Sequence, residues 1–141
     1  MTEPTAPPAH EFILLHYPCQ YPVPRFDDPR YDAIKASPPT GCTPENFNNM
    51  FGLQCQRTAP TLLDAVAEVC AEVNTTHGIL LNDLGLEKLW EFAPDGPNGF
   101  GATLIGQLLL MAAHRASLLG YTTEDLTRFL NTVTLTRPAD D

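Results

Sequence analysis

The chain has 141 residues, 43% of them hydrophobic, which indicates one folded domain (residues 1–141) rather than a disordered chain. Its formal net charge is −9 with only eight Lys and Arg residues, which disfavours binding to nucleic acid or to an anionic membrane surface. The N-terminal residues show neither the basic nor the apolar segment of a secretory signal. We therefore expect a cytoplasmic protein, from a bacterium or a phage.

The prolines divide the sequence into two parts, since 11 of the 14 lie at or before Pro60. Proline lacks a backbone N–H and restricts φ, so this distribution predicts an irregular arm over residues 1–57. A helical core is expected over residues 58–134, followed by a tail over 135–141. The predicted fold is all-α, a small bundle of three to four main helices with the Pro-rich arm wrapped on it.

Apolar side chains are interspersed among the prolines of the arm. Residues 11–17 form an apolar run that predicts a short strand or extended segment. Thr43-Pro44-Glu45 is typical of a helix start, so a short helix is expected over 44–51. The aromatic residues of the arm are candidates for contact with a partner protein or a second copy of this chain. They are Tyr17, Tyr21, Phe26 and Tyr31.

Two helices are predicted directly after the arm. The first begins near Thr61, where Asp64 completes a capping pair, and it ends between residues 74 and 78. Its apolar stripe is expected to face the core. A second helix is expected over 82–92, before a loop rich in glycine and proline.

The clearest predicted helix spans residues 100–119. It is apolar almost all round, so we expect it at the buried centre of the bundle, with Gly120 as its end. Thr122 then caps a fourth helix, whose third residue is Asp125.

Four polar residues fall on one narrow face of helix 100–119 and are the candidate ligand-binding set: Thr103, Gln107, His114 and Ser117. Buried polar groups need partners, so this face is expected to meet polar side chains, solvent or a ligand. His114 is the candidate general base, because a histidine titrates near neutrality. A hydrogen-bonded interior histidine is the alternative interpretation.

Acidic residues one turn apart on the first long helix are the candidate ligands of a divalent cation. They are Asp64, Glu68 and Glu72. They lie opposite the apolar stripe, so a solvated acidic face is the simpler interpretation. A second acidic set follows at Asp83, Glu87 and Glu91. No cofactor is predicted.

The four cysteines contain no CxxC pair: Cys19, Cys42, Cys55 and Cys70. Their long, irregular spacing favours reduced thiols packed as small apolar groups. Two alternatives stay open. One is a single disulfide between Cys42 and Cys55, and the other is a zinc site that adds His10 or His16.

The favoured function is a non-catalytic protein-interaction module, accessory or regulatory, because no nucleophile motif or phosphate loop is present. Such a module would bind a basic surface of a partner protein, or a second copy as a homodimer. The first alternative is a small ligand-binding protein or metal-dependent enzyme that uses His114 and Gln107 with helix carboxylates. The second is helix-turn-helix DNA binding by residues 116–129, which Glu124 and Asp125 oppose.

Overall fold

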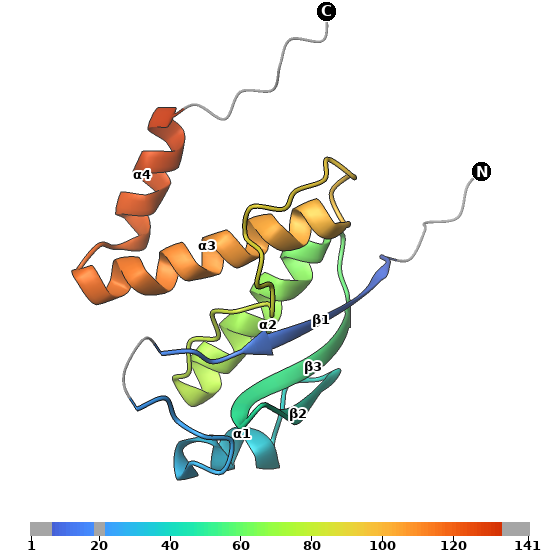
Figure 1. Cartoon of the computed structure of the whole chain (residues 1–141), viewed down its shortest axis with the longest axis vertical. Coiled ribbons are helices and arrows are strands. Elements are labelled where there is room, and N and C mark those ends of the chain that lie inside the picture. Colours follow the sequence, from blue (N-terminus) through green and yellow to red (C-terminus); the bar gives the residue numbers. More distant parts are fainter. Residues whose placement is uncertain (1–6, 19–21, 134–141) are drawn as a thin grey trace, which may run out of the picture.

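The structure, a computed structural model, describes residues 7–18 and 22–133. Three antiparallel strands form a sheet of order β1-β3-β2, and helices pack beside it (Figure 1). The strands are β1 (Ala9–Leu15), β2 (Cys42–Phe47) and β3 (Met50–Thr58). The all-α prediction, a helical bundle with an irregular arm, is therefore wrong. The fold is α+β, and the sheet lies in the part that the prolines assigned to the arm.

The β2–β3 hairpin replaces the short helix predicted over residues 44–51. Asn48 and Asn49 have φ of 52° and 71° and form a two-residue turn between the paired residues Phe47 and Met50. A turn with two positive φ angles matches the twist of a hairpin, and asparagine tolerates that conformation well. Pro44 lies in β2, an edge strand, which is where a sheet accepts proline.

The sheet buries alternate residues on one face, which is the period of a strand. The buried residues from β1 and β3 include Phe12, Leu14, Phe51, Leu53 and Cys55. A short 3₁₀ helix, η1 (Pro29–Tyr31), and α1 (Asp32–Ala36) follow the first strand and add Tyr31 and Ile34 to this core. The Pro-rich part of the chain therefore forms regular elements.

The first long helix, α2 (Leu62–His77), forms as predicted. Thr61 accepts a hydrogen bond from the Asp64 N–H at 3.1 Å, and Gly78 ends the helix with φ of 67°. α2 contacts β1 and α3, and its apolar stripe is buried. The stripe comprises Leu62, Ala65, Val66, Val69, Cys70 and Val73.

No helix forms over residues 82–92, so that prediction is wrong. The backbone here pairs with the end of β1 instead: Leu15 N–H donates to Asp83 O at 2.8 Å, and Asn82 N–H donates to Leu15 O at 3.0 Å. Leu81 and Leu84 are buried on either side of that bridge. The segment is thus an irregular connection, held to the core by a few leucines and a strand-like pairing.

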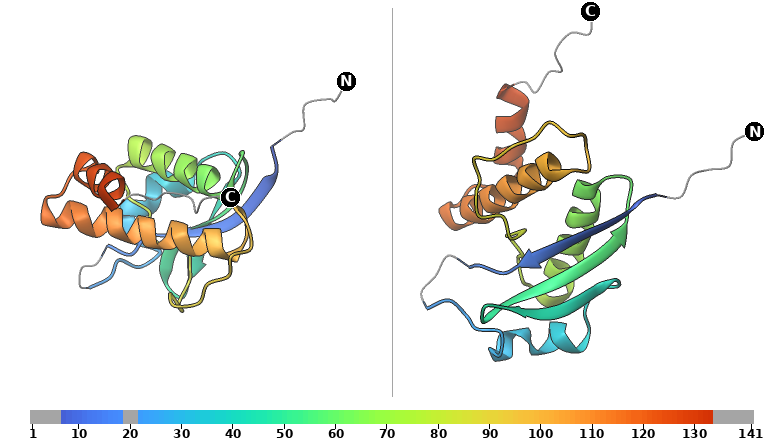
Figure 2. Two further views of the ribbon diagram at one scale, coloured as in Figure 1. Left: turned by 90° about the horizontal axis from the view of Figure 1, so that it is seen from above. Right: turned by 45° about the vertical axis from the view of Figure 1, so that its right-hand side comes forward.

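The last two described helices are α3 (Phe100–Leu119) and α4 (Thr123–Val133). α3 ends at Gly120 as predicted, and Thr122 caps α4 with the predicted pairing to Asp125. The buried-centre prediction for α3 is wrong, since most of its outward leucines are exposed. α4 buries no residue and leaves the end of α3 pointing away from the sheet (Figures 1 and 2).

Among the described residues, α3 is the one helix whose length and apolar composition would suffice to cross a membrane. The core helix of a soluble protein passes the same test, so this property decides little by itself. The predicted tail, 135–141, lies outside the described residues.

Candidate functional site

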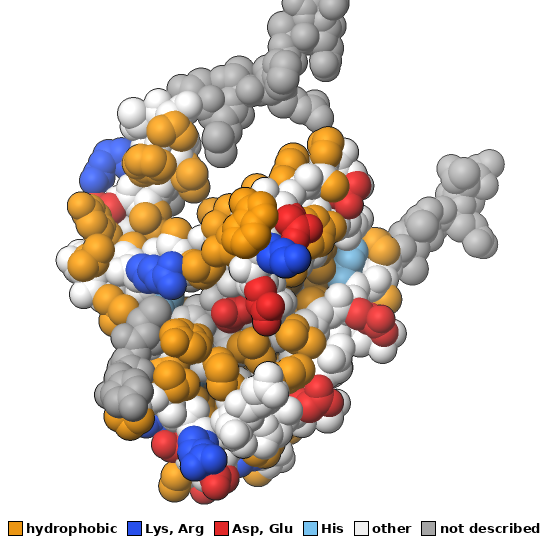
Figure 3. Space-filling view, viewed as in Figure 1, with side chains coloured by type: hydrophobic (Ala, Val, Ile, Leu, Met, Phe, Trp, Pro, Cys, Tyr) orange, Lys and Arg blue, Asp and Glu red, His pale blue; other side chains and the backbone are white. Residues whose placement is uncertain are grey.

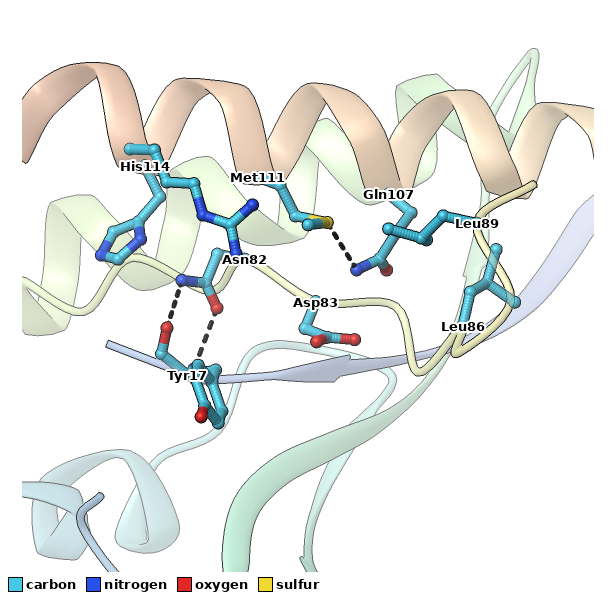
Figure 4. A pocket seen from close by; sticks show the side chains of 9 residues that line it. Tyr17, Asn82, Asp83, Leu86, Leu89, Gln107, Met111 and His114 are labelled. Atoms are coloured by element: carbon cyan, nitrogen blue, oxygen red, sulfur yellow. Dashed lines mark hydrogen bonds between the residues drawn. The ribbon is translucent and has the colours of Figure 1, made fainter. Parts of the chain in front are cut away.

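A small polar pocket lies between α3 and the segment that follows α2 (Figure 4). Gln107, Met111 and His114 reach it from α3, and Asn82 and Asp83 reach it from the facing segment. Its other lining residues are Tyr17, Leu86, Leu89 and Arg115. Two of the four predicted ligand-binding residues, Gln107 and His114, are therefore brought together here.

The polar face of α3 turns toward the protein, and its hydrogen bonds are largely internal. Gln107 is 1% exposed, accepts a hydrogen bond from Leu84 N–H, and donates to Met111 Sδ at 3.3 Å. The hydroxyls of Thr103 and Ser117 donate to carbonyls of their own helix, Gly99 O and His114 O. Thr103 and Ser117 do not line the pocket, so the predicted set of four does not form one site.

Two histidines near this pocket have lowered pKa values. The pKa of His16 is lowered to about 4, first by burial and then by the charge of Arg30 and the interaction with His114. Burial also lowers the pKa of His114, and the adjacent Arg115 adds to this effect. His16 Nδ1 lies 2.7 Å from the Tyr31 hydroxyl, which fixes its ring.

The pocket is poorly suited to catalysis. Its volume is about 100 Å³, below the range of roughly 300–1,000 Å³ that ligand sites occupy. The Asp83 carboxylate accepts a hydrogen bond from Gly85 N–H at 2.6 Å. No hydrogen bond or ion pair in the described residues joins Asp83 to His114, so a base and its orienting carboxylate are not assembled.

One arginine from β3 pairs with two of the three carboxylates of the acidic ladder on α2. Arg57 contacts Glu72 at 2.6 Å and Glu68 at 3.4 Å, while Asp64 contacts the capping hydroxyl of Thr61 at 2.9 Å. The carboxylates proposed as metal ligands thus have protein partners. The described residues contain no group of three or more His, Cys, Asp or Glu side chains that could hold a metal ion.

Two of the four aromatic residues of the arm, Phe26 and Tyr31, are anchored on the core. Tyr31 is fully buried and stacks on Phe51 with ring centroids 4.4 Å apart, and Phe26 stacks on the same ring at 6.0 Å. Tyr17 is 42% exposed beside the pocket. Tyr21 lies outside the described residues. Tyr31 therefore has no surface to offer a partner.

The largest unexplained feature is an apolar surface on α3 and α4, which the sequence analysis did not identify. It is formed by nine large apolar side chains, each 39–76% exposed. They are Ile105, Leu108, Leu109, Leu118, Leu119, Tyr121, Phe129, Leu130 and Val133. We call this set the α3–α4 surface. Figure 3 shows hydrophobic side chains exposed over these two helices.

The spacing of these residues makes two continuous stripes. On α3, Ile105, Leu108 and Leu109 lie at i, i+3 and i+4, which places them on the face opposite Gln107 and His114. On α4, Phe129, Leu130 and Val133 lie at i, i+1 and i+4, which also places them on one face of their helix. A groove of about 420 Å³ runs beside the α4 stripe. The signal that could have revealed this surface is a helix apolar all round followed by a short amphipathic helix.

The α3–α4 surface belongs to an electrically neutral part of an acidic chain. Residues 100–133 contain two cations, Arg115 and Arg128, against two acids, Glu124 and Asp125. Residues 1–99 contain five Lys or Arg against 13 Asp or Glu, a net charge of −8. The surface therefore carries apolar area without the negative field of the rest of the molecule.

Comparison with known proteins gives no match, since no family model, curated protein or solved structure is similar to this chain. The described residues form an α+β domain with a small pocket beside α3 and an extended apolar surface on α3 and α4.

Proposed function

We propose that this protein is a non-catalytic interaction module that docks through the α3–α4 surface, and that its partner is a second copy of the chain. The observation that carries the proposal is the exposure of nine large apolar side chains on helices whose net charge is zero. Contiguous apolar patches of this kind mark interaction sites on soluble proteins.

The exposed area is of the size that a dimer needs. At about half exposure, nine such side chains leave several hundred Å² of apolar area in water. One side of a standard interface buries roughly 800 Å², about 65% of it apolar in homodimers, which is about 500 Å². The α3–α4 surface alone supplies that order of area.

The two stripes also favour self-association. α4 cannot cover the α3 of its own chain, because it leaves the end of α3 at a steep angle (Figures 1 and 2). In a two-fold dimer, α4 of one copy would pack on α3 of the other, and the same contact would occur twice. Apolar side chains gathered on one face of each helix suit such helix–helix packing.

The charge distribution selects a second copy over other partners. Two chains of charge −9 repel each other, and they can meet with least repulsion where each is neutral. A basic partner protein would be drawn to residues 1–99 rather than to this surface. An anionic membrane is disfavoured because α3 and α4 carry only two cations.

The helix-turn-helix alternative finds no support at the start of α4. Asp125 accepts hydrogen bonds from Thr122 and pairs with Arg128 at 2.6 Å, so the one nearby cation is already engaged by a carboxylate. A recognition helix needs cations at that end to approach phosphates.

Sedimentation of the full chain over a concentration series tests the proposal. We expect a monomer–dimer equilibrium, with dissociation favoured on dilution. Leu109→Glu and Phe129→Glu each place a charge within the α3–α4 surface and should make the chain monomeric at every concentration. Ala71→Glu places the same charge on the exposed side of α2 and should leave the equilibrium unchanged.

Three results would reject the assignment. A wild-type chain that stays monomeric at high concentration rejects the second copy as partner. Dimerisation of both glutamate variants to the same extent as the wild type would place the interface elsewhere. Flotation of the wild type with vesicles of neutral lipid, abolished by Leu109→Glu, would reassign the surface to a membrane. Circular dichroism of each variant shows that the fold is retained.

A further inference from the structure

Cys42 and Cys55 lie directly opposite each other on β2 and β3. Gln56 N–H donates to Gly41 O at 2.9 Å, which makes the neighbouring pair of residues a hydrogen-bonded one. Pair types alternate along an antiparallel ladder, so Cys42 and Cys55 form a non-hydrogen-bonded pair, with Cα atoms about 4.5 Å apart. A disulfide requires a Cα separation of roughly 4.4–6.8 Å. The two sulfurs are free thiols in this structure.

An arginine lies beside this pair. The Arg57 guanidinium donates to Thr40 O at 3.1 Å, and Cys42 Sγ lies 3.8 Å from the same carbonyl oxygen. A hydrogen bond from the Cys55 thiol lowers the pKa of Cys42, and the charge of Arg57 lowers it further, while burial opposes both. The same hydrogen bond and burial raise the pKa of Cys55.

The two thiols therefore have different roles available. Cys42 is 7% exposed at the beginning of an edge strand, whereas Cys55 is 1% exposed in the central strand. Cys42 is the thiol that a small oxidant reaches first, and its environment favours the thiolate, which is the reactive form. Cys55 is placed to attack the oxidised sulfur of Cys42 and form a disulfide with it.

We propose that Cys42 and Cys55 are an oxidation site, at which a small hydroperoxide converts the pair into a reversible cross-strand disulfide. The proposal is independent of the α3–α4 surface, because it concerns the opposite part of the fold. It assigns a role to two cysteines that otherwise would serve only as small apolar groups in the core.

The chemistry balances in two steps. The Cys42 thiolate attacks one peroxide oxygen, so an S–O bond forms, the O–O bond breaks, and the leaving oxygen takes a proton and departs as water or alcohol. The Cys55 sulfur then attacks Cys42 Sγ, so the S–S bond forms, the S–O bond breaks, and hydroxide leaves with the thiol proton as water. The two sulfurs together lose two electrons, and an external dithiol returns them by exchange.

The test is treatment of the folded full chain with hydrogen peroxide, followed by intact mass and peptide mapping. We expect the chain to lose two hydrogens, about 2 Da, with a Cys42–Cys55 cross-link that dithiothreitol reverses. The oxidised chain should melt roughly 5–10 °C higher, because the cross-link restricts the conformations of the unfolded chain.

Single substitutions separate the roles. In Cys55→Ser, Cys42 should accumulate sulfenic acid that a cyclic dione captures, and in Cys42→Ser the reaction with peroxide should slow at least tenfold. Cys70→Ser is the matched control, since burial raises the pKa of this α2 thiol to about 12 and it lies outside the strand pair. It should form the cross-link at the wild-type rate.

Several outcomes would overturn the proposal. They are retention of the full mass under peroxide, a cross-link that involves Cys19 or Cys70, and direct conversion of Cys42 to sulfinic acid in the wild type. Equal rates for the wild type and Cys42→Ser would do the same. The intact mass and peptide mapping that decide the proposal use the wild-type chain. Poor folding of a variant would therefore not change their result.

Discussion

α2 and α3 are both amphipathic, yet they direct opposite kinds of residue toward the protein. α2 buries its valines and Leu62 and leaves Glu68 and Glu72 about half exposed. α3 buries Gln107 and His114 and leaves Leu108 and Leu109 in water. The comparison teaches that the apolar face of a helix is the core face only when the rest of the chain can cover it.

The reason for the inversion is the amount of chain available. The sheet and α2 cover each other, and the irregular segment 79–84 fills the remaining core with Ile79, Leu81 and Leu84. α3 is then attached through its small and polar face, where a Cβ on Gly106 would come within 3.0 Å of Leu63 and Leu84. Nothing described in this chain covers its other side, so burial there requires association.

The largest test of the comparison uses one residue type in the two regions. Phe51→Ala removes a fully buried ring that stacks on Tyr31 and should lower the free energy of unfolding by about 3–5 kcal/mol. Phe129→Ala removes a ring that is 64% exposed and should change it by less than about 0.5 kcal/mol in dilute, monomeric protein.

Urea unfolding of the two variants at low protein concentration measures both effects. A loss above about 2 kcal/mol for Phe129→Ala in the monomer would mean that α4 packs on its own chain in solution, and the distinction between the two regions would fail.

The second test is the pH dependence of stability at the junction of the regions. Because the pKa of His16 is about 4 when folded and 6.5 when unfolded, the unfolded chain binds the extra proton between these values. The free energy of unfolding should thus fall by about 2 kcal/mol as pH decreases from 6.5 to 4, allowing for partial exposure of the ring. Above about pH 7.5 neither state binds this proton and the contribution is constant.

His16→Gln keeps a side chain that hydrogen-bonds to Tyr31 but cannot titrate. It should flatten the curve between pH 6.5 and 4, while the loss from carboxyls with lowered pKa, such as Asp95 held by the Gly101 and Phe100 N–H groups, begins only below about pH 4. Urea unfolding at stepped pH is the measurement. An unchanged slope in the variant would assign the pH dependence to other groups.

A third test exchanges the residue types at two neighbouring positions of α3, one buried and one exposed. Gln107→Leu leaves the Leu84 N–H without its acceptor in a buried site and should cost about 1–3 kcal/mol, although it adds apolar surface. Leu108→Gln, on the outward face, should leave monomer stability within about 0.5 kcal/mol and weaken self-association. Urea unfolding and sedimentation of both variants measure these effects. Stabilisation by Gln107→Leu would contradict the view that α3 directs its polar face toward the protein.

The sequence predicted those helices whose ends are fixed locally. Thr61 with Asp64, and Thr122 with Asp125, cap their helices by hydrogen bonds within one turn, and Gly120 ends α3 with φ of 91°. Such signals depend on neighbouring residues alone, which is why they hold in the folded chain.

The β2–β3 hairpin and the α3–α4 surface were missed for different reasons. Phe51, Leu53 and Cys55 alternate as a strand does, but Thr43-Pro44-Glu45 and the proline content outweighed that pattern in the prediction. The orientation of α3 depends on what the distant segments leave uncovered, and no periodicity within the helix encodes that. Gln107 and His114 were identified as a polar face, but the partner of Gln107, the Leu84 backbone, lies on a segment predicted to be helical.

The smallest expected effect concerns ion pairs, which again differ between the two regions. Arg57 is 17% exposed and holds Glu72 and Glu68 of α2, so Arg57→Gln should cost about 0.5–1 kcal/mol and leave the carboxylates of the ladder to repel one another. Arg128 on α4 is 71% exposed and pairs only with Asp125 among the described residues, so Arg128→Gln should cost less than about 0.5 kcal/mol. Salt should reduce the first cost only in part, because the Arg57 side chain is mostly shielded from water, and should abolish the second. Urea unfolding at low and high salt measures the two losses of stability. Equal losses would mean that the Arg57 pairs between β3 and α2 contribute no more than the exposed Arg128–Asp125 pair within α4.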